Sequence, residues 1–192
     1  MARHHQRCAC RVAVDPARLS DSINHAVYNR RMILDLPLIL ETRRNHALEH
    51  ATLRILARKY KTSMAGHSNP TGFFLLGDVT TEDVIACVNE AHTRLNSGES
   101  GLAVHEGCGT NLVVGAVLPA AFAWMPLRGA RSTFWRVGLI PFALALALFG
   151  YALSRPLGPW LQKHITTEAD LGDMQIVDIR LVRKGLHRVV TK

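Results

Sequence analysis

The sequence predicts an α+β soluble domain, with two main helices and a small sheet, joined to a two-helix transmembrane hairpin. Two uncharged stretches predict the hairpin: residues 107–127 and 137–154 carry no charged side chain over 21 and 18 residues. Each is about long enough to cross a hydrocarbon core of roughly 30 Å as a helix. The flanking segments show helical and strand periodicity with polar positions, which is typical of a soluble α+β domain.

These patterns divide the chain into three parts. Residues 1–30 are rich in Arg and His and predict a weakly ordered basic arm. Residues 31–110 and 162–192 predict a single soluble domain, and 111–161 the hairpin between its two pieces. An even number of membrane crossings returns the chain to the same side, so both pieces can build one domain.

The elements of the soluble domain follow from local signals. A helix is expected after Pro37 and runs to about Tyr60, with a turn over 66–72 and a buried strand over 73–76. Thr80 and the acids after it predict the start of a second helix, which ends near Asn96.

The tail predicts two further strands. Residues 173–183 alternate apolar and charged side chains, and a turn at Lys184-Gly185 leads to a short strand over 186–190. A lone hairpin is only marginally stable, so we expect this one to dock on the 73–76 strand.

The lack of a nucleic-acid motif and the scatter of the cysteines argue against a nucleic-acid-binding protein and against a disulfide-rich protein. The formal net charge of +8 comes without a nucleic-acid motif, and it fits basic segments beside anionic lipids. We therefore expect the lipid bilayer and an unidentified protein or peptide as partners, and no nucleic acid. The four scattered cysteines do not form a disulfide framework.

The expected location is the inner, or cytoplasmic, membrane, with the soluble domain in the cytoplasm. Residues 1–18 lack the apolar core of a signal peptide. The arginine-rich loop over 128–136 favours the opposite orientation under the positive-inside rule, so both orientations stay open.

The central feature of the chain is the segment NHALEHA at residues 45–51. His46 and His50 are four residues apart with Glu49 between them, so a helix presents all three on one side. Leu48 and Ala51 form a second apolar face opposite, which predicts packing on both sides and partial burial of the trio. A buried polar cluster needs hydrogen-bond partners or a metal ion.

The order H-x-x-E-H resembles the motif of the inverzincin metallopeptidases over five residues. The resemblance implies that His46 and His50 bind zinc and that Glu49 is the catalytic general base. The alternative is a helix whose histidines only form hydrogen bonds. Glu90 was weighed as an acidic third ligand, but an ion pair with Arg94 at i+4 is the preferred assignment.

Two further candidate metal ligands, His105 and Cys108, lie on a glycine-rich turn at the entrance to the first uncharged stretch. Together with His46 and His50 they would give four nitrogen and sulfur ligands, the set typical of a structural zinc site. Three ligands would instead indicate catalysis. Cys108 as a simple buried thiol is the remaining alternative.

Several separated segments also resemble an uncharacterised bacterial membrane protein family, a domain of unknown function with a HALEHA helix and a CGTN turn before a transmembrane hairpin. The matching segments are HALEHATLRILA, NPTGFFLLGDV and NEAHTRLNSGESGLAVHEGCGTN, within residues 40–160. The resemblance implies an integral membrane protein and brings no activity.

The sequence thus supports two functional hypotheses. The first is a membrane-anchored zinc-dependent hydrolase, with a peptidase as one form of it. The second is a non-enzymatic membrane protein in which the His/Glu cluster holds a structural metal or only hydrogen bonds, and in which the domain is an interaction module.

Overall fold

The structure is a computed structural model and describes residues 33–61, 63–130 and 132–192. This part of the chain consists of helices and a small antiparallel sheet. The basic arm expected over 1–30 lies outside the described residues. Residues Pro37–Lys192 form one compact unit. Its elements are α2 (Pro37–Lys59), β1 (Ala65–Asn69), β2 (Gly72–Leu76), α3 (Thr81–Asn96), the 3₁₀-helix η1 (Ser100–Ala103), α4 (Gly109–Leu127), α5 (Thr133–Gly138), α6 (Ile140–Leu161), the π-helical turn η2 (Gln162–Thr166), β3 (Ile176–Arg183) and β4 (Leu186–Thr191).

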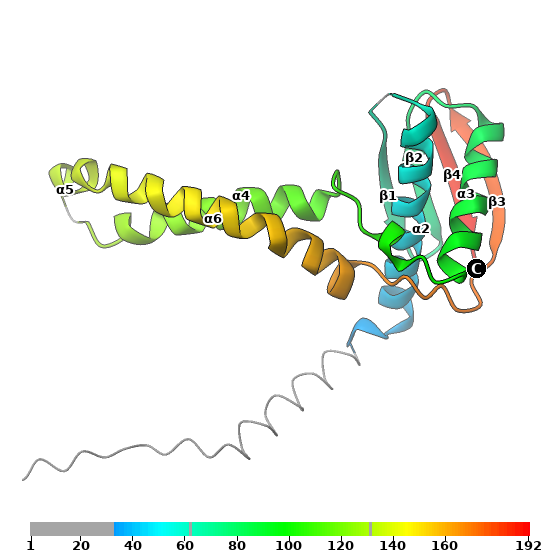
Figure 1. Ribbon diagram of the computed structural model, residues 1–192, viewed down its shortest axis with the longest axis horizontal. Helices are drawn as coiled ribbons and strands as arrows, with labels where there is room; N and C mark the ends of the chain where they lie inside the picture. The colour runs from blue at the N-terminus through cyan, green and yellow to red at the C-terminus, as the bar shows by residue number, and fades with distance from the viewer. Residues whose placement is uncertain (1–32, 62, 131) are drawn as a thin grey trace, which may run out of the picture. The chain divides into compact units, whose positions relative to one another are not determined.

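The four strands form one antiparallel sheet in the order β1-β2-β4-β3 (Figure 1). β2 lies before the hairpin in the chain and pairs with β4 after it, with Phe73 opposite Val189. The expected docking of the tail on the 73–76 strand is therefore confirmed. Both chain segments that flank the hairpin contribute strands to this sheet.

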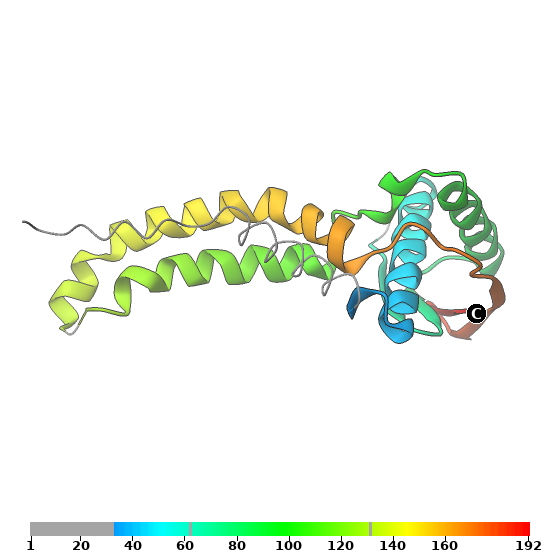
Figure 2. The ribbon, with the colours of Figure 1, turned by 90° about the horizontal axis from the view of Figure 1, so that it is seen from below.

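Helices α2 and α3 pack against each other and against the sheet, as Figures 1 and 2 show. The predicted second helix is confirmed: the Thr80 side chain caps α3 by accepting from the Asp83 backbone N–H. Leu48, Phe73 and Val88 are fully buried in the core between these elements. The apolar stripes of both helices thus meet the inward side chains of β2 and β4.

The region from Gly66 to Gly72, predicted as a turn, is mostly a strand. β1 pairs with β2 along its whole length, and only Pro70 and Thr71 lie between the two strands. The prediction was wrong because β1 has the sequence AGHSN, without apolar alternation. Backbone hydrogen bonds to β2, rather than side-chain burial, hold this edge strand in place.

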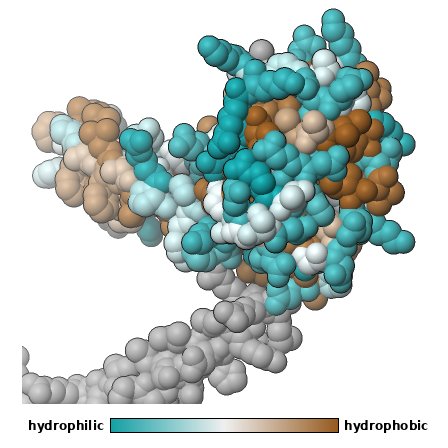
Figure 3. Space-filling model, turned by 45° about the vertical axis from the view of Figure 1, so that its right-hand side comes forward, coloured by the Kyte–Doolittle hydropathy of each residue, from teal (hydrophilic) through white to brown (hydrophobic). Residues whose placement is uncertain are grey.

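Helices α4 and α6 lie alongside each other and are long and apolar enough to cross a membrane. At their contact, a Cβ on Gly150 would lie 3.0 Å from the Leu118 carbonyl oxygen, so glycine permits the close approach. The outward side chains are apolar, with Leu112 and Leu148 at least 70% exposed. Figure 3 shows brown and tan side chains gathered on the hairpin, whereas teal side chains spread over much of the rest.

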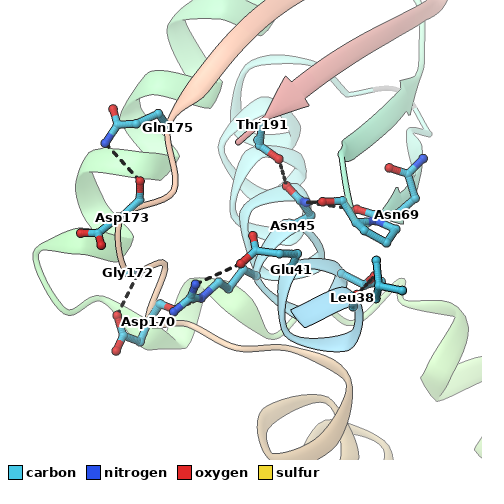
Figure 4. A network of polar contacts seen from close by, with 12 residues as sticks. Leu38, Glu41, Asn45, Asn69, Asp170, Gly172, Asp173, Gln175 and Thr191 are labelled. Atoms are coloured by element: carbon cyan, nitrogen blue, oxygen red, sulfur yellow. Dashed lines mark hydrogen bonds and ion pairs between the residues drawn. The ribbon is translucent and has the colours of Figure 1, made fainter. Parts of the chain in front are cut away.

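A buried amide ties α2 to two distant parts of the sheet (Figure 4). Asn45 is fully buried, and its Nδ2 donates to the carbonyl oxygens of Asn69 and Pro70 at 3.0 and 3.3 Å. Its Oδ1 accepts from the Thr191 hydroxyl at 2.7 Å. One side chain therefore fixes the β1–β2 turn and the end of β4 on α2, directly beside His46.

Replacing Asn45 with Ala should lower the free energy of unfolding by about 1–3 kcal/mol, because buried carbonyl and hydroxyl groups lose their partner. Thermal unfolding of the full chain in detergent, followed by circular dichroism, measures this. The matched control is Asn89→Ala, at an exposed position in the middle of α3. An equal effect of both substitutions would contradict the role assigned to Asn45.

Candidate metal centre

Helix α2 brings His46, Glu49 and His50 to one side, as their spacing predicts. Glu49 and His50 are 4% and 1% exposed, and His46 is partly buried. The two imidazole rings lie edge to face, with their centroids 4.2 Å apart. The expected partial burial of this trio is therefore confirmed.

Each imidazole is oriented by a backbone carbonyl from another segment. His46 Nδ1 donates to the Thr166 carbonyl at 2.9 Å, and His50 Nδ1 donates to the Ala103 carbonyl at 2.7 Å. Since a carbonyl only accepts, both rings carry a proton on Nδ1. Nε2 is therefore the nitrogen that each ring, in its neutral form, offers to a metal ion.

Cys108 completes a compact group of three ligand atoms. It is the N-cap residue of α4, and its Sγ lies 3.6 Å from His46 Nε2. One ligand atom each from His46, His50 and Cys108 lies within 4.8 Å of the other two. Tetrahedral ligands about 2.0–2.3 Å from a zinc ion are roughly 3.3–3.8 Å apart, so the His46–Cys108 separation fits.

His105, the fourth ligand of the closed set considered above, lies beside this group but does not belong to it. Its ring centroid is 5.6 Å from that of His50. Its backbone N–H donates to the Gln162 side chain at 2.9 Å, which fixes the turn that leads to Cys108. Among the described residues, the compact group therefore has three members, and His105 lies next to it.

Glu49 lies next to the three ligand residues, and its carboxylate accepts a hydrogen bond from a neighbouring strand. The Ser68 hydroxyl of β1 donates to Glu49 Oε2. A Cβ at Gly66 would lie 2.2 Å from Glu49 Oε1, so this strand position is glycine to make room for the carboxylate. Burial raises the pKa of Glu49, although the Ser68 hydrogen bond and the neighbouring imidazoles oppose the rise.

Glu90, the rejected ligand candidate, lies elsewhere. Its carboxylate is 3.1 Å from Arg94 Nη1 on the exposed side of α3, as the i+4 spacing predicts.

The thiol of Cys108 is acidic in this environment. Burial by itself would raise its pKa, but hydrogen bonds from His46, His50 and Thr110 outweigh this and lower the pKa to about 5. Burial likewise opposes the charged form of His46, yet the contact with Cys108 and the Thr166 carbonyl give a net rise in its pKa. A thiolate at neutral pH is the form that binds metals and acts as a nucleophile.

Three cavities have His46 in their lining. One, about 220 Å³, has the three ligand residues, Glu49 and His105 in its lining. A second, about 240 Å³, shares Glu49 and Cys108 and extends to Ser68. The third, about 540 Å³, begins at His46 and leads away along α2.

Sequence reasoning missed the residues that support the site. Ser68 and the carbonyl groups of Ala103 and Thr166 come from segments far from α2 in the chain, and backbone acceptors leave no trace in a sequence. Gly66 did carry a signal, because an isolated glycine in a strand indicates close approach of another group. It was assigned to a turn instead.

The ultraviolet absorbance of the thiolate should titrate with a midpoint of about 5 in metal-free protein. The difference between wild type and Cys108→Ser isolates this group from the other cysteines. His46→Ala should move the midpoint upward, because it removes a hydrogen bond that stabilises the thiolate. A wild-type midpoint at the ordinary value of 9.0 would contradict the described contacts.

Comparison with known proteins places the chain in a family. Residues 41–179 match the family described as "Domain of unknown function (DUF6391)". An uncharacterized protein of Picosynechococcus sp. is 34% identical over 147 residues, which cover 69% of each chain. No solved structure matches the chain. The match includes α2 with its two histidines and the turn with Cys108, and the chain belongs to the DUF6391 family.

Proposed function

We propose that the chain is a membrane-anchored, zinc-dependent hydrolase in which His46, His50 and Cys108 hold the metal and Glu49 is the general base. The observation that carries this proposal is the compact group of three ligand atoms, with both histidines oriented through Nδ1. Oriented imidazoles with free Nε2 atoms are typical of metal sites, because a carbonyl bound to the other nitrogen fixes the ring.

The donor set and the cavity favour catalysis over a structural metal. Structural zinc sites are closed by four protein ligands, whereas catalytic sites have three and keep a position for water or substrate. Here the group of mutually close ligand atoms has three members, and the cavity of about 220 Å³ beside them is lined by His105 as well. A bound zinc ion would polarise the substrate carbonyl and lower the pKa of water.

Glu49 is suited to act on a proton in this cavity. Its raised pKa brings it closer to neutral pH, where a general base is most effective, and the Ser68 hydroxyl fixes one carboxylate oxygen. In this role it accepts a proton from the attacking water and delivers it to the leaving nitrogen or oxygen. The water oxygen bonds to the carbonyl carbon as the bond to the leaving atom breaks.

The hairpin supplies the membrane anchor in this proposal. Two apolar helices of spanning length, with exposed apolar side chains, suit a bilayer better than water. Gln162 links both helix ends to the site: its Oε1 accepts from His105 N–H, and its Nε2 donates to Asn111 Oδ1 of α4 at 2.7 Å. We infer that the site lies close to the cytoplasmic surface of the inner membrane.

Elemental mass spectrometry on untagged, full-length protein in detergent tests the metal. We expect stoichiometric zinc in the wild type, and loss of it in a His46→Ala, His50→Ala double variant. The matched control is His105→Ala, which removes a neighbouring imidazole and should keep the metal. Metal-free wild type purified without chelator would contradict the proposal.

Glu49→Gln should keep the metal while lowering the hydrolysis of a p-nitrophenyl butyrate probe by about 10²–10⁴-fold, the usual effect of losing a general base. The metal-free double histidine variant provides the background rate. If Glu49→Gln keeps zinc but the wild type hydrolyses no faster than this background, the cluster is a structural metal site in an interaction module.

A further inference from the structure

We propose that the groove leading away from His46 binds the acyl chain of a membrane amphiphile, whose ester or amide group is the bond that is cleaved. This inference rests on the proposed hydrolase and names its substrate class. Its basis is the position, lining and continuity of the groove.

The groove has a volume of about 540 Å³ and a mostly apolar lining. Leu38 and Ile39, from the first turn of α2, form one side together with Pro70 of the β1–β2 turn. Leu38 is 71% exposed, the largest exposed fraction among the large apolar side chains described outside residues 109–161. Such a surface matches a hydrocarbon chain better than it matches a polar substrate.

The groove continues directly into the candidate metal centre. His46, Thr42 and Thr110 line both the groove and the adjoining cavity of about 240 Å³. That cavity adds Glu49 and Cys108 to its lining. The path therefore changes from apolar to polar toward the ligands, so a molecule with an apolar tail and a polar end fits it in one orientation.

The ends of the hairpin form part of the groove wall. Thr110 is the second residue of α4, and Thr166 is the last residue of the second candidate span, Ile140–Thr166. The groove wall thus includes the points where both helices leave the hydrocarbon region in the proposed orientation. A chain in the bilayer can enter it without crossing water, which favours an acyl amphiphile over a soluble peptide.

The reaction uses water as co-reactant. The oxygen of water forms the new bond to the acyl carbon, and the bond from this carbon to the head-group oxygen or nitrogen breaks. The proton accepted by Glu49 passes to that leaving atom. The products are a fatty acid and an alcohol or amine.

A series of straight-chain hydroxamates, from acetohydroxamate to octanohydroxamate, tests whether the groove binds an alkyl chain. The hydroxamate end chelates zinc, and the alkyl end extends into the groove. Binding is measured by calorimetry in detergent, with metal content determined in parallel. We compare the wild type with a groove variant that carries both Leu38→Ser and Ile39→Ser, and with a control variant, Ile85→Ser, at an exposed apolar position of α3. Comparing variants removes the contribution of partitioning into micelles.

We expect wild type and the Ile85 control to gain about fourfold in affinity for each buried methylene. The groove variant should lose most of this gain while binding acetohydroxamate and zinc as the wild type does. Equal chain-length dependence in all three proteins, or a preference for leucine hydroxamate over octanohydroxamate, would overturn the inference and leave the metal site standing. Wild type without zinc would overturn the proposed function and this inference with it.

Discussion

The site depends on two hydrogen bonds in which α2 histidines donate to carbonyl groups of other segments. His46 reaches Thr166 at the end of η2, and His50 reaches Ala103 of η1. Each bond fixes both the tautomer and the direction of a ring, so that Nε2 faces the partner ligand atoms. Without these two carbonyls, i+4 spacing would bring the rings together without selecting the nitrogen that faces Cys108.

The same segments connect the site to the hairpin. The turn η2, which ends at Thr166, follows directly after α6 in the chain. Cys108 directly precedes α4. Arg43 of α2 donates to the Ile165 and Thr167 carbonyls, so it holds the η2 segment from the same helix as the histidines. The candidate ligands therefore come from two segments, α2 and the turn before α4, and η2 after α6 orients one of them.

Much of this arrangement was predictable from local patterns. The spacing of His46 and His50 on an amphipathic helix, the Thr80 cap and the alternation in the tail all predict what the structure shows. Cys108 was identified as a candidate because it follows a glycine-rich turn. The β1 strand was missed because its polar sequence carries no period-two signal. Sequence spacing could not place His105 relative to the ligand group either, because its backbone N–H is held by Gln162 from a distant segment. Tertiary contacts of that kind have no local signature.

X-ray absorption spectroscopy at the zinc edge tests the central claim most directly. The three-ligand centre predicts one sulfur neighbour at about 2.3 Å and two imidazole nitrogens at about 2.0–2.1 Å, with a light oxygen or nitrogen atom as the fourth neighbour. The sulfur contribution should vanish in Cys108→Ser. A wild-type spectrum without sulfur would contradict the account, and so would three imidazoles, which would place His105 in the centre.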